Sequence, residues 1–97
     1  MCGAPKQGGA LAGIDLSTQT VIQGQVWHDG ATVAGAYVRL LDGTDEFTAE
    51  VVTSPEGEFR FFAAPGAWKV RSLAPVGKGE RVVAADVGLN ETTIVIE

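Results

Sequence analysis

The side chain in this sequence with the most reactive chemistry is the thiol of Cys2, the only cysteine among 97 residues. It lies in the opening MCGAPKQGG, where glycines provide little bulk to pack over it. A thiolate there can attack a persulfide or disulfide sulfur of another protein, and a positive charge close to the thiol, which Lys6 could supply, would favour the thiolate. We therefore predict Cys2 as a sulfur-acceptor residue. The alternative is an exposed thiol without a role.

Two other groups of polar residues have types that occur in catalytic or metal sites. His28 and Asp29 are adjacent, but Asp-Gly suits a turn, and no second histidine or nearby nucleophile completes a triad. Asp42, Asp45 and Glu46 offer oxygens to calcium, but their spacing lacks the ordered ligand positions of a calcium loop. We interpret both as turns and predict no catalytic residue, no metal, no cofactor and no enzymatic activity.

Composition narrows the class of partner. Twelve acidic and seven basic residues give a net charge of -5, which predicts no general attraction to nucleic acid or anionic membranes. One cysteine and one histidine cannot form an internal disulfide or a zinc site with four protein ligands. The N-terminal residues lack the continuous apolar run of a secretion signal, so we expect a cytoplasmic protein.

The elements that must position these residues are β-strands. Residues 1–19, with four glycines and no sustained apolar period, predict a flexible arm, and residues 20–97 predict one folded domain. Seven β-rich runs follow, at residues 20–27, 36–42, 47–54, 58–63, 67–74, 81–88 and 92–97. Short strands separated by turn residues are typical of an all-β sandwich or barrel.

Turn residues separate several of these runs. HDG and LDG supply residues that tolerate positive φ, SPEG places proline early and glycine late in a turn, and PG suits the centre of a type II turn.

Alternation along the runs divides their residues between a core and an outer surface. The predicted core comprises Ile22, Gly24, Val26, Val38, Leu40, Ala49, Val51, Phe59, Phe61, Trp68, Val70, Ile94 and Ile96. The remaining large side chains then point outward: Tyr37, Leu41 and Phe62, joined by Trp27 and Val52. So much exposed apolar surface indicates a protein partner or a homo-oligomer, unless strand edges or the arm cover it.

The pattern G-x-V, G-A-x-V-x-L, G-x-F-x-F and P-G-x-W-x-V between Gly24 and Val70 resembles a carboxypeptidase regulatory-like domain. That resemblance implies a transthyretin-like, seven-stranded antiparallel β-sandwich. One fold hosts many functions, so it implies little about activity.

The opening MCGAP and the stretch from RLLDGTDEF to FFAAPG resemble a narrower group, the SseC family of small actinobacterial proteins of unknown function. The resemblance implies a link to sulfur metabolism, because members are encoded beside rhodanese-type thiosulfate sulfurtransferases. It supplies no catalytic residues. The sequence departs from related domains at Trp27 and His28, where these usually have small or polar residues.

Two hypotheses follow. In the first, the chain is an accessory protein that partners a thiosulfate sulfurtransferase, with Cys2 accepting or relaying sulfane sulfur and Trp27, Tyr37, Leu41 and Phe62 on the docking surface. In the second, it is a non-catalytic interaction or structural module and Cys2 is incidental. Sugar stacking on surface aromatics is a weaker third hypothesis, because no pair of carboxylates flanks an obvious groove.

Overall fold

The structure is a computed structural model that describes residues 14–97, so Cys2 and most of the predicted arm lie outside the described residues. Every regular element within that range is a β-strand, which confirms the all-β class. The strands are β1 (Thr20–His28), β2 (Ala31–Thr32), β3 (Tyr37–Leu41), β4 (Phe47–Val52), β5 (Glu58–Ala63), β6 (Gly66–Ala74), β7 (Gly77–Ala85) and β8 (Gly88–Val95). No membrane-crossing helix occurs among these residues.

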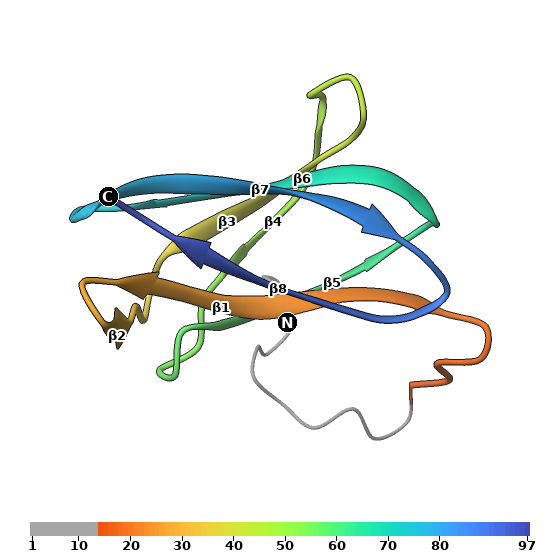
Figure 1. Cartoon of the computed structure of the whole chain (residues 1–97), viewed down its shortest axis with the longest axis horizontal. Helices are drawn as coiled ribbons and strands as arrows, with labels where there is room; N and C mark the ends of the chain where they lie inside the picture. The colour runs from red at the N-terminus through yellow and green to blue at the C-terminus, as the bar shows by residue number, and fades with distance from the viewer. Residues whose placement is uncertain (1–13) are drawn as a thin grey trace, which may run out of the picture.

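The strands form two sheets that lie in two layers (Figure 1). Sheet A contains β1, β2, β5 and β8, with β1 at its centre. Sheet B has the order β4-β3-β6-β7. The chain crosses between the sheets four times, after β2, β4, β5 and β7. The core therefore lies between strands from all parts of the described chain.

Two features differ from the predicted seven antiparallel strands. The structure has eight strands in the described range, because the two-residue β2 forms a short hairpin with β1. In addition, β8 pairs with β1 in parallel, from Thr20 opposite Gly88 to Trp27 opposite Val95. The last crossing from β7 brings β8 to the free side of β1 in the same direction as β1.

The core lies between the inner faces of the two sheets, as alternation predicted. Ten predicted core residues are buried, and Ala49 and Trp68 pack against them while partly exposed. The predicted core omitted Ala36, Val83 and Ala85, which are also buried in this cluster. Phe59 and Phe61 of β5 pack with their ring centroids 6.0 Å apart.

Of the predicted turns, HDG, LDG and SPEG lie where expected, whereas PG does not form the centre of a type II turn, because Gly66 has a φ of +145° and already begins β6. Asp29 and Gly30 both have positive φ in the two-residue β1–β2 turn, and Gly57 has a φ of +77° where its N–H donates to Ser54 O. In the turn after β3 the positive φ falls on Asp45 rather than on Asp42 or Gly43.

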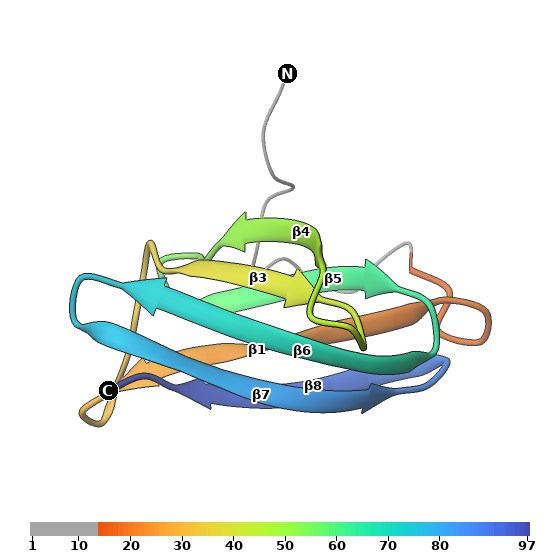
Figure 2. The ribbon, with the colours of Figure 1, turned by 90° about the horizontal axis from the view of Figure 1, so that it is seen from above.

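Sheets A and B meet at one edge, where β7 lies beside β8 (Figures 1 and 2). The backbones of Lys78 and Glu97 exchange two hydrogen bonds, of 3.2 and 3.0 Å. A Cβ on Gly79 would lie 2.4 Å from Val95 O, so only glycine permits this approach. Gly77 and Gly79 therefore belong to a strand, although glycine in a sequence usually predicts a break in one.

Candidate functional site

The four predicted partner-surface residues lie on two different sheets and do not form one patch. Tyr37 and Leu41 belong to β3 of sheet B, whereas Trp27 and Phe62 belong to β1 and β5 of sheet A. Each alternates with a buried core neighbour, so the two pairs are on the outer faces of opposite layers. The two faces are therefore considered separately.

On sheet B, Tyr37 is the centre of an exposed apolar row. It is paired with Val52 of β4 on one side and with Leu73 of β6 on the other. The three residues are 53%, 43% and 38% exposed, respectively. We call Val52, Tyr37 and Leu73 the Tyr37 row. It ends beside Lys78, which is paired with Leu73 on β7.

The adjacent row on the same face is charged. Register places Glu50, Arg39, Arg71 and Glu80 side by side across the four strands. Arg39 Nε donates to Glu50 Oε2 at 2.7 Å, and Arg71 Nε donates to Glu80 Oε1 at 3.2 Å. These exposed ion pairs contribute little to stability. They do leave the row neutral, although the whole chain is acidic.

The prediction that Leu41 is an exposed partner residue is wrong, because its side chain is only 5% exposed. Leu41 is paired with Lys69 on β6 and, across a bulge in the β3–β4 pairing, with Phe47. Lys69 Nζ lies 2.9 Å from Asp45 Oδ1 in the loop after β3, which raises the Lys69 pKa through that hydrogen bond. Leu41 thus lies on the outer face of the sheet but is covered.

On sheet A, the outer face has a polar row with apolar residues on both sides of it, among which Phe62, Leu89 and Val95 are exposed. Arg60 Nε donates to Gln23 Oε1 at 3.1 Å, and Gln23 Nε2 donates to Glu91 Oε2 at 3.4 Å, which forms a row across β5, β1 and β8. Trp27 is partly buried and donates through Nε1 to Gln25 Oε1 at 3.2 Å. Of the predicted residues on this face, only Phe62 is highly exposed, at 55%.

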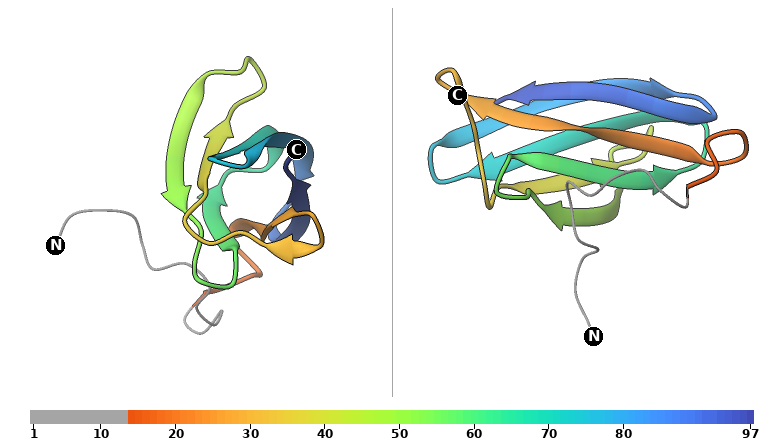
Figure 3. Two further views of the ribbon diagram at one scale, coloured as in Figure 1. Left: turned by 90° about the vertical axis from the view of Figure 1, so that its left-hand side faces the viewer. Right: turned by 90° about the horizontal axis from the view of Figure 1, so that it is seen from below.

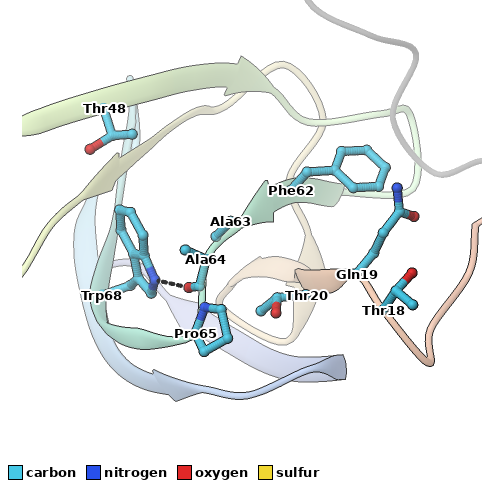
Figure 4. A pocket seen from close by; sticks show the side chains of 9 residues that line it. All are labelled: Thr18, Gln19, Thr20, Thr48, Phe62, Ala63, Ala64, Pro65 and Trp68. Atoms are coloured by element: carbon cyan, nitrogen blue, oxygen red, sulfur yellow. Dashed lines mark hydrogen bonds between the residues drawn. The ribbon is translucent and has the colours of Figure 1, made fainter.

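Phe62 also lines a depression of about 620 Å³ at the edge where the two sheets remain apart (Figure 4). Trp68 lies on another side of it and donates from Nε1 to Ala64 O at 2.8 Å. The lining has no charged side chain: Thr18, Gln19, Thr20, Thr48, Phe62, Ala63, Ala64, Pro65 and Trp68. This composition offers apolar contact and hydroxyl groups but no acid or base for catalysis.

His28 and Asp29 have structural contacts in the β1–β2 hairpin. His28 Nδ1 lies 2.9 Å from Ile96 O, which ties the imidazole to the backbone after β8. Asp29 has a φ of +51° in the turn, a conformation that aspartate tolerates better than most residues. These contacts agree with the interpretation of HDG as a turn.

The acidic residues after β3 also serve their own turn. Asp42 Oδ1 accepts hydrogen bonds from Thr44 N, Thr44 Oγ1 and Glu46 N at 2.8, 2.7 and 3.1 Å. These donors, first the Thr44 hydroxyl, lower the Asp42 pKa. Asp45 pairs with Lys69 instead. In residues 14–97, no three or more side chains of the metal-binding types gather in one place.

The Tyr37 row was only partly predicted from the sequence. Val52 and Tyr37 were expected to face outward, but Leu73 was not identified. The sequence could have predicted that Leu73 faces outward, because Leu73 and Arg71 alternate with Val70 and Ser72 along the strand. The register of β3 with β6, which places Leu73 beside Tyr37, is a tertiary property.

Comparison with known proteins finds close relatives. A family model described as "Protein of unknown function (DUF1416)" matches residues 2–96, a range that begins at Cys2. The uncharacterized proteins Rv0814c and Rv3118 of Mycobacterium tuberculosis (strain ATCC 25618 / H37Rv) are each 54% identical over 99 residues, which covers 99% of this chain and 99% of the relative. An uncharacterized protein of Mycolicibacterium smegmatis is 55% identical over 85 residues, 86% of this chain and 94% of the relative.

Proposed function

We propose that this chain, which belongs to the DUF1416 family of proteins of unknown function, is a non-catalytic protein-interaction module whose contact surface is the outer face of sheet B. The observation that supports this role is the Tyr37 row, in which three large side chains on adjacent strands are each more than one-third exposed. Aromatic and aliphatic residues that lie together at a surface are typical of the centres of protein interfaces.

We further propose that the partner is a rhodanese-type thiosulfate sulfurtransferase and that Cys2 accepts sulfane sulfur from it. The support is the resemblance of the MCGAP opening and the RLLDGTDEF stretch to the SseC family. In this step the Cys2 thiolate attacks the outer sulfur of the enzyme's persulfide. One S–S bond breaks as another forms, the enzyme leaves as a thiolate, and no external oxidant or reductant is needed.

The motifs between Gly24 and Val70 support the proposal of a transthyretin-like β-sandwich of the carboxypeptidase regulatory-like group. We propose a cytoplasmic location, where Cys2 would be reduced. We assign the domain no reaction of its own, in keeping with the structural contacts of His28, Asp42 and Asp45.

Two measurements on one set of variants test these proposals. Binding of a rhodanese-type sulfurtransferase is measured by titration calorimetry for wild type, Cys2→Ser and Tyr37→Ser. Intact-mass spectrometry after incubation with the enzyme and thiosulfate, without reductant, then detects sulfur on the chain. We expect Tyr37→Ser to weaken binding at least tenfold, and Cys2→Ser to bind normally but gain no sulfur.

The matched control for Tyr37→Ser is Val82→Ser, because Val82 is 74% exposed on the same sheet but lies outside the Tyr37 row. A tenfold loss in both variants would contradict a specific role of the row. Normal binding without a sulfur gain, with the enzyme shown to carry persulfide, would remove the relay and leave the interaction module. No binding by wild type would exclude this class of partner.

A further inference from the structure

Among residues 14–97, the free edge of sheet B is β4, which pairs with β3 on one side only. β4 lies at the margin of the molecule in two perpendicular views (Figures 2 and 3). An unpaired edge presents a row of backbone N–H and C=O groups that can pair with another strand.

The backbone groups that β4 leaves free follow from its hydrogen-bond pattern. Thr53 N donates to Ala36 O at 2.9 Å, immediately after the end of β4. Hydrogen bonding in an antiparallel ladder alternates from one residue to the next. The N–H and C=O groups of Val51 and Ala49, opposite Val38 and Leu40, therefore face β3, and those of Glu50 and Val52 face away from the sheet.

Side chains along this edge do little to prevent pairing. The strand FTAEVV contains no lysine and no proline, residues that commonly protect edge strands. Its only charge, Glu50, is neutralised by Arg39 at 2.7 Å. Phe47 and Val52 are 62% and 43% exposed beside the free backbone groups. The free edge of β5, in contrast, has the charged residues Glu58 and Arg60.

We propose that two copies of this chain form a dimer by antiparallel pairing of their β4 strands. A strand that pairs with its own copy about a two-fold axis makes every contact twice, so a single edge supplies both halves of the interface. Within β4 itself the only charge, that of Glu50, is compensated by Arg39, so the strand adds no net charge of its own to the interface. The proposal is independent of the sulfurtransferase and of Cys2.

Charge also selects a register. Pairing centred on Glu50 would place two Glu50 carboxylates directly opposite each other, which destabilises a sheet. Pairing centred on Val51 places Glu50 opposite Val52 of the second copy, so that the outward-facing N–H and C=O groups of both residues are bonded. The Tyr37 rows of the two copies then lie on one continuous sheet.

A proline substitution tests this arrangement directly. Glu50→Pro removes an N–H that faces away from β3, so the hydrogen bonds between β3 and β4 within one chain are kept. The β4 strand of the second copy loses a hydrogen-bond donor and collides with the proline ring. Glu50→Thr is the matched control, since it removes the same carboxylate but keeps the N–H. Sedimentation velocity over a wide concentration range then measures the mass of each protein.

We expect wild type and Glu50→Thr to reach twice the chain mass of 10.1 kDa, and Glu50→Pro to remain at that mass. A wild type that stays monomeric at every concentration would overturn the proposal. So would a dimer that persists in Glu50→Pro, because it would use another surface.

If circular dichroism shows that Glu50→Pro does not fold, amide hydrogen exchange of the wild-type protein tests the pairing instead. The exchange rates of the Glu50 and Val52 amides must fall as the protein concentration rises, and unchanged rates would contradict the pairing.

Discussion

The two sheets approach each other closely at one lateral edge and stay apart at the other. At the β7–β8 edge, the backbones of the two sheets touch and exchange hydrogen bonds between Lys78 and Glu97. Arg81 Nε adds a 3.0 Å hydrogen bond to Thr93 O. At the opposite edge, β4 and β5 separate after their connecting turn, and the uncharged depression lined by Phe62 and Trp68 lies there (Figure 4).

Side-chain volume accounts for much of this difference. Glycines at positions 77 and 79 remove the atoms that would hold β7 away from β8. Thr48, Phe62 and Trp68 occupy the corresponding space at the other edge. After the end of β4, a side chain ties the β4–β5 turn to the connection between β2 and β3: Thr53 Oγ1 donates to Val33 O at 2.7 Å and accepts from Ala36 N at 2.9 Å. One edge is thus closed by backbone contact, and the other is not.

The largest expected effect comes from adding one methyl group to the closed edge. In Gly79→Ala the new Cβ would lie 2.4 Å from Val95 O and 3.3 Å from Ile94 Cγ2, so β7 and β8 must move apart. We expect a loss of about 2 kcal/mol or more in the free energy of unfolding, measured by urea denaturation.

The matched control for that change is Gly43→Ala. Its Cβ would meet only Ala67 O, at 3.8 Å, an ordinary contact. We expect its free energy of unfolding to change by less than about 0.5 kcal/mol. Equal effects of the two substitutions would show that the β7–β8 contact does not require glycine.

An intermediate effect is expected from Thr53→Val, in the turn that follows β4. Valine keeps the branched shape but leaves Ala36 N–H and Val33 O without the hydroxyl that bridges them. Because Thr53 is buried, we expect a loss of about 1–2 kcal/mol in the same urea measurement. Thr48→Val on the exposed face of β4 is the control and should change stability little. A Thr53→Val protein as stable as wild type would show that the two hydrogen bonds of the Thr53 hydroxyl make no net contribution to the free energy of unfolding.

The smallest expected effect concerns the pH dependence of the exposed turn after β3. The hydrogen bonds from Thr44 and Glu46 lower the Asp42 pKa below its ordinary value of 3.8. The ionised form is therefore favoured in the folded state, so this contribution to stability is present above pH 3.8 and is lost as pH falls through the lowered pKa. We expect the melting temperature of Asp42→Ala to be lower than that of wild type at neutral pH.

The difference in melting temperature should shrink as the pH falls below 3.8. Thr44→Ala, which removes only the hydroxyl donor, should give a smaller change of the same sign. A difference that stays constant with pH would show that the Asp42 charge is not what stabilises the turn.

The sequence predicted the core well because burial in a strand follows a period of two. Ile22 and Val26, Phe59 and Phe61, and Ile94 and Ile96 were assigned to the core and are buried. The starts of β7 and β8 were missed, because Gly77 and Gly88 normally indicate breaks. Whether a glycine ends a strand or permits close contact depends on a neighbour that is distant in the sequence.

The candidate surface was predicted less well for a related reason. Alternation correctly assigned Tyr37, Phe62 and Leu41 to outer faces, but it contains no information about what covers an outer face. Leu41 is buried although it is paired with Phe47 of β4 and Lys69 of β6 on the outer face. Tyr37 and Phe62 are exposed on different sheets.

By itself, then, the sequence determined the all-β class, the turns at Asp29–Gly30 and Ser54–Gly57, and most of the core, because each depends on residues within a few positions along the chain. Only the tertiary structure decided that β8 runs parallel to β1, that glycines join β7 to β8, and that Val52 and Leu73 lie beside Tyr37. These features depend on the order in which strands enter the sheets, and that order is set by contacts between residues far apart in the chain.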